Sequence, residues 1–343
     1  MGKIKLAVIG TSVYAQRLTG CIQKNAPEYL EVFHCEAKED LSKVLPRLQP
    51  DILLCEQEIQ TEKNLSRQTV QIQLIDDQNL AGEAGGSDQN TKQIDKKIFR
   101  YQRGSEILRQ VFQIYEQNSK KNLVCRCKTA EIEMTAFYAP CGHELLLPFS
   151  VSYAALCSAH TKVLYLNLSE FSGMRILFGD RDGTNFSDLI YGIRQKNERF
   201  PLYLQSVLHH AEQFDYVLPP ANPKDLYEIQ EQDLACLLTL LQQQTQYKKI
   251  VWNCGTLNHS SEQIMESCSK IYCLVRESIF GRFRKTEFEQ FLRKQSLGKI
   301  LEKIQFVNPQ AGNGIFTAGV DVLTQLQSGS FAAQVRKLTG EVS

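Results

Sequence analysis

The sequence predicts an α/β protein with two doubly wound parallel sheets. Short apolar runs alternate with amphipathic helical segments along most of the chain, which is typical of parallel strands covered by helices on both faces. The length of 343 residues is enough for two domains, each with its own core. A polar stretch interrupts the alternation, and we therefore expect domains at 1–118 and 131–343 joined by a linker at 119–130.

Apolar runs in the first domain predict five strands, at 4–9, 30–33, 51–55, 70–75 and 97–101. Helices are predicted from Ser12 to Gln23, from Asp40 with a kink at Pro46, and from Ser105, which we expect to be an N-cap. The last helix has its apolar residues on one stripe: Ile107, Leu108, Val111, Ile114 and Tyr115. Residues 81–90 are rich in glycine and polar side chains and predict a flexible loop.

The second domain continues the alternation of strands and helices. Strands are predicted at 131–138, 162–168, 215–218, 249–253, 270–275 and 304–307. Helices are predicted near 149–159, 185–194, 199–211, 231–244, 260–267 and 285–294.

Composition excludes several classes of function. The formal net charge of +1 gives no electrostatic reason to expect nucleic acid as a partner. No stretch has the roughly 18 consecutive apolar residues of a membrane span, and the N-terminus is predicted to be a strand rather than a signal peptide. We therefore expect a cytoplasmic protein without membrane insertion.

The eleven cysteines are scattered, and no Cys-x-x-Cys pair occurs. This pattern favours buried thiols in a reducing compartment over a disulfide framework. Cys125 with Cys127, and Cys141 with His143, lack the further ligands that a metal ion needs. We expect no metal site.

The turn after the strand at 131–138 is the place of a phosphate loop in nucleotide-binding chains. Such a loop needs glycines so that backbone amides can close on the phosphates, and a lysine to neutralise them. Gly142 is present, but apolar residues and one acid follow it. The degenerate loop consists of Pro140, Cys141, Gly142, His143, Glu144, Leu145, Leu146 and Leu147. We expect its leucines to pack down as an apolar plug, with Pro148 starting the next helix.

The segment 49–56 resembles the third strand of the receiver domains of response regulators. In that family the phosphoacceptor Asp ends this strand, and two acids after the first strand bind Mg²⁺. Here Glu56 occupies the first position and Gly10–Ser12 the second, which is a poor site for a hard cation. The resemblance implies a receiver-like adaptor with a degenerate phosphoacceptor position at Glu56. A dinucleotide-binding unit starting at Gly10 is the alternative, although Ser12 and Ala15 replace its other glycines.

Several phrases of the second domain, in their order, resemble the ParA/MinD-type ATPases and, within them, the TadZ/CpaE group, which joins an atypical receiver domain to a ParA-like domain. These phrases lie at 139–142, 162–168, 216–225, 247–255 and 270–275. The resemblance implies a P-loop NTPase fold in which Asn167, Asn253 and Gly255 are degenerate switch positions. Phosphoryl transfer depends on the missing lysine, hydroxyl and acid. We therefore expect a pseudo-ATPase without a cofactor, although backbone dipoles leave weak ATP binding open.

A basic and aromatic cluster at 276–285 is a further candidate region. It contains Arg276, Arg282, Arg284 and Lys285. Such charges usually belong to a solvated loop and helix start, and the functional alternative is an interface for an acidic partner or lipid headgroups. His209 and His210 are expected at the end of a helix, where its dipole favours cations.

The resemblance implies a non-catalytic localisation or scaffold protein for a Tad-like type IV pilus or secretion apparatus. Its partners would be proteins of that machinery, it would homodimerise across the former nucleotide face, and it would be recruited to the cytoplasmic face of the membrane or to a cell pole. Two alternatives stay open: an ATP-binding ParA/MinD-type ATPase with an unorthodox loop, and an NAD(P)-dependent oxidoreductase built on the N-terminal strand.

Overall fold

The structure is a computed structural model that describes residues 3–27, 29–36, 41–56, 69–77, 96–119, 132–140, 142–179, 183–195, 199–310 and 321–340. The chain forms two compact units: Met1–Val124 with Pro201–Ser206, and Cys125–Phe200 with Val207–Ser343. The predicted loop at 81–90 lies outside the described residues, as does the predicted linker except for Ser119.

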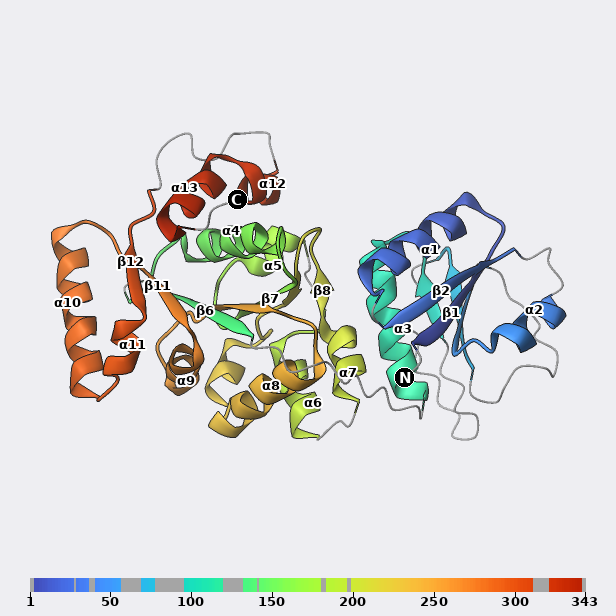
Figure 1. Ribbon diagram of the computed structural model, residues 1–343, viewed down its shortest axis with the longest axis horizontal. Coiled ribbons are helices and arrows are strands. Elements are labelled where there is room, and N and C mark those ends of the chain that lie inside the picture. Colours follow the sequence, from blue (N-terminus) through green and yellow to red (C-terminus); the bar gives the residue numbers. More distant parts are fainter. Residues whose placement is uncertain are drawn as a thin grey trace. The chain divides into compact units, whose positions relative to one another are not determined.

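The first unit contains a parallel five-stranded sheet, of which Figure 1 labels β1 and β2. The strand order is β2-β1-β3-β4-β5. Its strands are β1 (Ile4–Ile9), β2 (Leu30–Cys35), β3 (Ile52–Cys55), β4 (Val70–Ile75) and β5 (Lys97–Phe99). Its helices are α1 (Val13–Asn25), α2 (Leu41–Leu48) and α3 (Gly104–Asn118). This is the flavodoxin-like strand order, whose ligand site lies at the carboxyl ends of β1 and β3. It differs from the order of the dinucleotide-binding folds.

The helices of the first unit begin for different reasons. Ser12 is the N-cap of α1, because its hydroxyl accepts a hydrogen bond from the Ala15 amide at 3.1 Å. The prediction that Ser105 caps α3 is wrong: the N-cap is Arg103, and it makes no side-chain cap. A Cβ on Gly104 would lie 2.5 Å from the sulfur of Cys21, so close packing against α1 selects glycine at this helix start.

The second unit contains a seven-stranded sheet with the order β12-β11-β6-β10-β7-β9-β8, in which β8 alone runs antiparallel to its neighbour. Its strands are β6 (Glu133–Tyr138), β7 (Val163–Asn167), β8 (His209–His210), β9 (Asp215–Val217), β10 (Lys249–Asn253), β11 (Lys270–Leu274) and β12 (Ile304–Val307). Its helices are α4 (Leu146–Ser158), α5 (Met174–Phe178), α6 (Phe186–Arg194), η2 (Pro223–Tyr227), α8 (Glu231–Gln244), α9 (His259–Ser267), α10 (Ile279–Lys294), α11 (Gly298–Glu302), α12 (Val322–Ser328) and α13 (Ser330–Thr339). α7 (Phe200–Val207) belongs to the first unit except for its two end residues.

Several predicted boundaries in this unit are corrected. α4 begins at Leu146, so Pro148 is its third residue and not its first. α10 begins at Ile279 and not near 285, because the Ser278 hydroxyl accepts a hydrogen bond from the Gly281 amide at 2.9 Å and caps the helix. α5, η2, α11, α12 and α13 are not among the helices predicted from the sequence.

His209 and His210 form the edge strand β8 and do not end a helix, which corrects the prediction. The Nδ1 atom of His210 lies 2.5 Å from one carboxylate oxygen of Asp215, and the Tyr247 hydroxyl donates to the other at 2.5 Å. Burial alone would raise the pKa of Asp215, but the hydrogen bonds from His210 and Tyr247 hold it below its ordinary value. This pairing, rather than a helix dipole, holds His210, whereas His209 lies 2.8 Å from the Thr184 carbonyl oxygen through its Nε2 and stacks on Tyr216.

The core of the second unit surrounds α4. Ten of its 13 residues are buried, and the helix packs against the sheet on one side and against α12 and α13 on the other (Figure 1). A helix that is apolar on all sides is stable only when it is enclosed in this way. The Ser152 hydroxyl donates to the Leu326 carbonyl at 2.6 Å, and Phe137, Tyr153 and Tyr272 pack as an aromatic cluster. α4 is therefore a fixed support for the loop that precedes it.

None of the helices in the described part of the chain is both long enough and apolar enough to cross a membrane.

Candidate functional site

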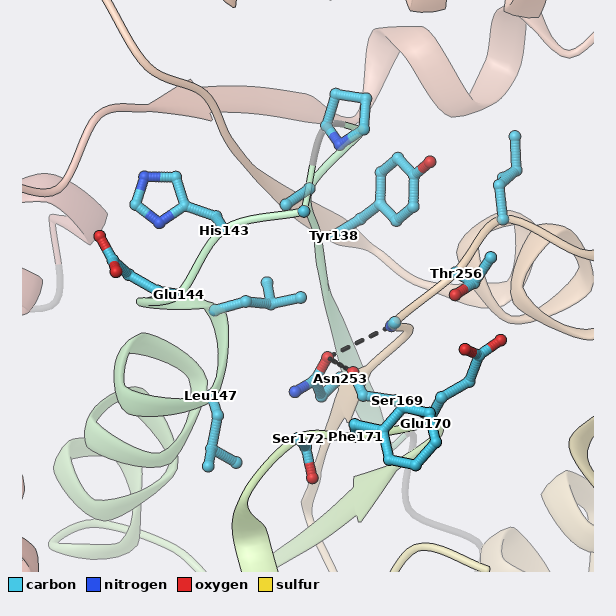
Figure 2. A pocket seen from close by; sticks show the side chains of 16 residues that line it. Tyr138, His143, Glu144, Leu147, Ser169, Glu170, Phe171, Ser172, Asn253 and Thr256 are labelled. Carbon is cyan, nitrogen blue, oxygen red and sulfur yellow. Dashed lines mark hydrogen bonds between the residues drawn. The ribbon is translucent and has the colours of Figure 1, made fainter. Parts of the chain in front are cut away.

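A cavity of about 370 Å³ lies where the chain leaves the carboxyl ends of β6, β7 and β10 (Figure 2). Doubly wound sheets bind their ligands at this edge. The cavity is lined by the predicted degenerate loop, by the segment 169–172 after β7, and by Asn253 with 255–257 after β10. Of the predicted loop, Pro140, Gly142, His143, Glu144, Leu146 and Leu147 line the cavity, Leu145 does not, and Cys141 lies outside the described residues.

Gly142 forms the turn of the loop. Its φ is +62°, and its amide donates to the Ala139 carbonyl at 3.0 Å. Residues that carry a Cβ are strained at such a φ, so the backbone conformation requires glycine here. No heavy atom lies within 4 Å of the place where a Cβ would stand, so conformation rather than crowding makes the selection.

His143 replaces the next expected glycine and is mostly buried. Its Nδ1 accepts a hydrogen bond from the Leu145 amide at 3.2 Å, so this nitrogen carries no proton. Burial and, after it, the nearby Arg276 guanidinium lower the pKa of His143 below its ordinary value. The imidazole is therefore neutral near pH ~7 and adds no positive charge to the cavity.

The charged side chains in the cavity wall are acidic. Glu144 lies 3.4 Å from Arg276, but both side chains are more than half exposed, so this ion pair contributes little to stability. Glu170 accepts a hydrogen bond from the Tyr227 hydroxyl. No Lys or Arg is found among the described residues that line the cavity. A triphosphate would meet carboxylates where a phosphate loop supplies a cation.

The apolar plug is only partly present. Leu145 and Phe149 are buried in the core around Phe137, as expected, and Leu146 and Leu147 are also largely buried. The crevice nevertheless stays open, with Leu146 and Leu147 in its wall. Leu145 is the N-cap of α4, and Leu146 and Leu147 lie in its first turn. Their burial on that helix leaves the space between the strand ends unfilled.

Asn167 and Asn253 lie at the predicted switch positions, at the ends of β7 and β10, and both are buried. The side-chain oxygen of Asn167 accepts a hydrogen bond from the Ser169 amide at 2.8 Å. That of Asn253 accepts from the Ser169 hydroxyl at 3.0 Å and from the Gly255 amide at 3.3 Å (Figure 2). Asn253 therefore joins the loops after β7 and β10, while Asn167 holds the loop after its own strand, and neither amide buries a charge.

Gly255 completes this junction. Its φ is +56°, and a Cβ would lie 2.6 Å from the Ser169 Cα and 2.8 Å from the Leu168 carbonyl oxygen. Both the left-handed backbone and the close approach of the neighbouring loop thus require glycine.

The N-terminus of α4 reaches the cavity without a side-chain cap. Its N-cap is Leu145, and its first turn has no acidic residue. The helix dipole attracts anions weakly at such an end. The Leu145 and Leu146 amides already donate to the side chain and carbonyl of His143, and Pro148 has no amide to offer. The dipole favours a phosphate, in contrast to the carboxylates of the wall.

Glu56 lies at the carboxyl end of β3, as predicted, and is engaged by Ser12. The Ser12 hydroxyl donates to one carboxylate oxygen, and the Ser12 amide donates to the other at 3.4 Å. A Cβ on Gly10 would collide with this carboxylate, so the glycine serves the Glu56 contact. Asp76 pairs with Arg100 at 2.6 Å and does not join Glu56.

No group of three or more His, Cys, Asp or Glu side chains in the described ranges is placed to hold a metal ion. Cys125 and Cys127 lie outside these ranges.

The four cations of the basic cluster do not converge on one site. Arg276 contacts Glu144 at the cavity, whereas Arg282 and Arg284 are exposed on α10. The Lys285 nitrogen lies 4.0 Å from the centre of the Phe306 ring and 3.8 Å from Glu289.

The wall segment 169–172 and Thr256 were not among the predicted site residues. A usable signal was their position directly after predicted strands, because the carboxyl ends of parallel strands meet at one edge of the sheet.

Comparison with known proteins gave matches to solved structures. No family model and no curated protein matches the chain. A ParA family ATPase from Chlorobium tepidum TLS is 12% identical with a TM-score of 0.46, covering 62% of this chain and 95% of its own. A putative plasmid partition protein from Borrelia burgdorferi bound to AMPPNP is 11% identical, with a TM-score of 0.45. The match covers 62% of this chain and 99% of the partition protein. The MinC:MinD cell division complex from Aquifex aeolicus gives 10% identity and a TM-score of 0.40, covering 62% and 97%.

Proposed function

We propose that the second unit is a ParA/MinD-type P-loop domain that no longer hydrolyses nucleotide and serves in localisation or as a scaffold. The cavity at the ends of β6, β7 and β10 carries the proposal. It keeps the position and the glycine turn of a phosphate site, but its described lining has no Lys or Arg. Phosphoryl transfer needs cations on the transferred group and an acid that organises the metal. A neutral His143 and the amide of Asn253 supply neither.

The finer role rests on the order of the two units. A flavodoxin-like unit ahead of a ParA-like unit is the arrangement of the TadZ/CpaE group, which the sequence resembles. On this proposal the protein helps to place a Tad-like pilus or secretion apparatus, its partners are proteins of that apparatus, and it homodimerises across the cavity face. The engagement of Glu56 by Ser12 supports an adaptor role for the first unit over phosphoryl acceptance.

Titration calorimetry of the full chain with Mg·ATP, combined with a phosphate-release assay, tests the loss of catalysis. We expect no phosphate release above the buffer rate. Saturable ATP binding accompanied by turnover would refute the proposal. Light scattering after gel filtration tests the proposed homodimer. If the protein is a monomer at high concentration, the proposed dimerisation across the cavity face is wrong.

One observation favours a second function, in which nucleotide binds without being hydrolysed. The cavity is open, and the uncapped N-terminus of α4 reaches it. This function predicts saturable ATP binding that Gly142→Val abolishes, because valine is strained at a φ of +62°. Glu144→Gln should strengthen the same binding by removing a carboxylate from the wall.

A further inference from the structure

The start of α10 exposes three large apolar side chains. Ile279 is 60% exposed, Phe280 74% and Phe283 62%. Their spacing places them on one side of the helix, and the rings of Phe280 and Phe283 meet edge to face with centroids 6.0 Å apart. α10 lies at the margin of the second unit, at the left of Figure 1. Clustered apolar side chains on a surface mark interaction sites.

The backbone holds these side chains outward. The Ser278 hydroxyl accepts a hydrogen bond from the Gly281 amide at 2.9 Å. Gly281 is buried, and a Cβ at this position would collide with the Arg276 carbonyl. On the opposite side of α10, Phe288 is buried and packs on Tyr138 with ring centroids 5.1 Å apart. The exposure of the apolar residues is therefore a property of an anchored helix start.

Two exposed arginines flank this apolar group. Residues 276–287 contain four basic side chains and two acidic ones, Glu277 and Glu287. Arg282 and Arg284 are exposed and flank the apolar group on opposite sides of the helix. We refer to Ile279, Phe280, Phe283, Arg282 and Arg284 as the α10 patch. Its apolar centre and its two arginines match an anionic and partly apolar surface, and Glu287, one turn after Phe283, is the exposed acid on the same side of the helix.

We propose that the α10 patch binds an anionic lipid surface, with its three apolar side chains inserted between headgroups and its arginines on lipid phosphates. A stable protein interface takes about 20–30 residues on each side, and the patch is far smaller. Insertion into lipid needs no complementary partner surface, and a few apolar side chains with neighbouring cations give weak, reversible, salt-sensitive binding. This inference does not depend on the nucleotide cavity.

Sedimentation of the full chain with vesicles tests the proposal. We expect binding to vesicles of phosphatidylcholine with phosphatidylglycerol, weaker binding at high salt, and none to phosphatidylcholine alone. Replacing both phenylalanines, Phe280→Ser with Phe283→Ser, should lower the partition constant by about tenfold or more. Arg282→Gln with Arg284→Gln should lower it by about tenfold. The matched control is Ile176→Ser on α5, whose side chain is 87% exposed, and it should leave binding unchanged.

Circular dichroism confirms that each variant is folded before its binding is compared. The proposal is overturned if the native chain ignores anionic vesicles, or if Ile176→Ser weakens binding as much as the phenylalanine variant. It is also overturned if vesicles are not bound while a photo-crosslinker at position 280 captures an acidic protein, since the patch would then be a protein interface.

Discussion

Gly255→Ala should lower the free energy of unfolding of the second unit by about 2–5 kcal/mol. The left-handed backbone at φ +56° contributes about 1–2 kcal/mol of this for a residue with a Cβ. The rest comes from crowding, because the new Cβ would stand 2.6 Å from the Ser169 Cα, where carbon atoms prefer separations of about 3.5–4.0 Å. Relief requires the loops after β7 and β10 to separate, and such overpacking typically costs about 1–3 kcal/mol.

Gly142→Ala is the matched control, because Gly142 has the same backbone region with open space around it. It should cost only the conformational part, about 1–2 kcal/mol. Trp252 is the single tryptophan of the chain and is fully buried in β10, so its fluorescence during urea unfolding reports on the second unit. If the two variants lose equal stability, the close contact between the loops does not exist in solution and the reasoning is wrong.

Three further predictions concern other parts of the molecule. The pKa of His143 is lowered in the folded state, so protonation favours unfolding, and the free energy of unfolding should fall as the pH drops through about 6.5. Urea titrations at several pH values should show a flatter pH dependence for His143→Asn. An unchanged pH dependence in this variant would contradict the prediction. Ser12→Ala removes the N-cap of α1 and a hydrogen-bond donor to Glu56. Hydrogen exchange should show that the free energy of opening α1 falls by about 1–2 kcal/mol. Unchanged protection of the α1 amides would argue against both contacts. Asn253→Asp buries a carboxylate beside a cavity whose described lining has no cation. The free energy of unfolding, monitored by Trp252 fluorescence, should fall by at least about 1 kcal/mol, and the variant should not bind ATP. Stabilisation of the variant by Mg²⁺ would contradict this prediction, because it would show that the carboxylate creates a metal site.

The strands were predictable because their signal is local. β10 and β12 begin and end at the predicted residues, since each is a short, largely apolar run between polar residues. β8 was mistaken for a helix end, because a two-residue strand has no periodicity and exists through its pairing with β9. The start of α10 was missed for a different reason: Ile279, Phe280 and Phe283 face solvent, which inverts the pattern that indicates an amphipathic helix.

The candidate site was predictable in its chemistry and not in its shape. Six of the eight degenerate loop residues line the cavity, because a turn after a central parallel strand must lie at the carboxyl edge of the sheet. Whether the leucines fill the crevice depends on where α4 begins, and the helix start at Leu146 was set by tertiary packing.

The sequence by itself determined which chemical groups are present: one loop glycine, no lysine in the loop, and amides at the ends of β7 and β10. These are properties of single residues and need no fold to be known. The tertiary structure decided that the cavity stays open and that Ser169 and Asn253, 84 residues apart, form a hydrogen bond in its wall. It also decided that the start of α10 faces outward. Such features depend on how distant segments share space, and close packing of a core is a property of all its residues together.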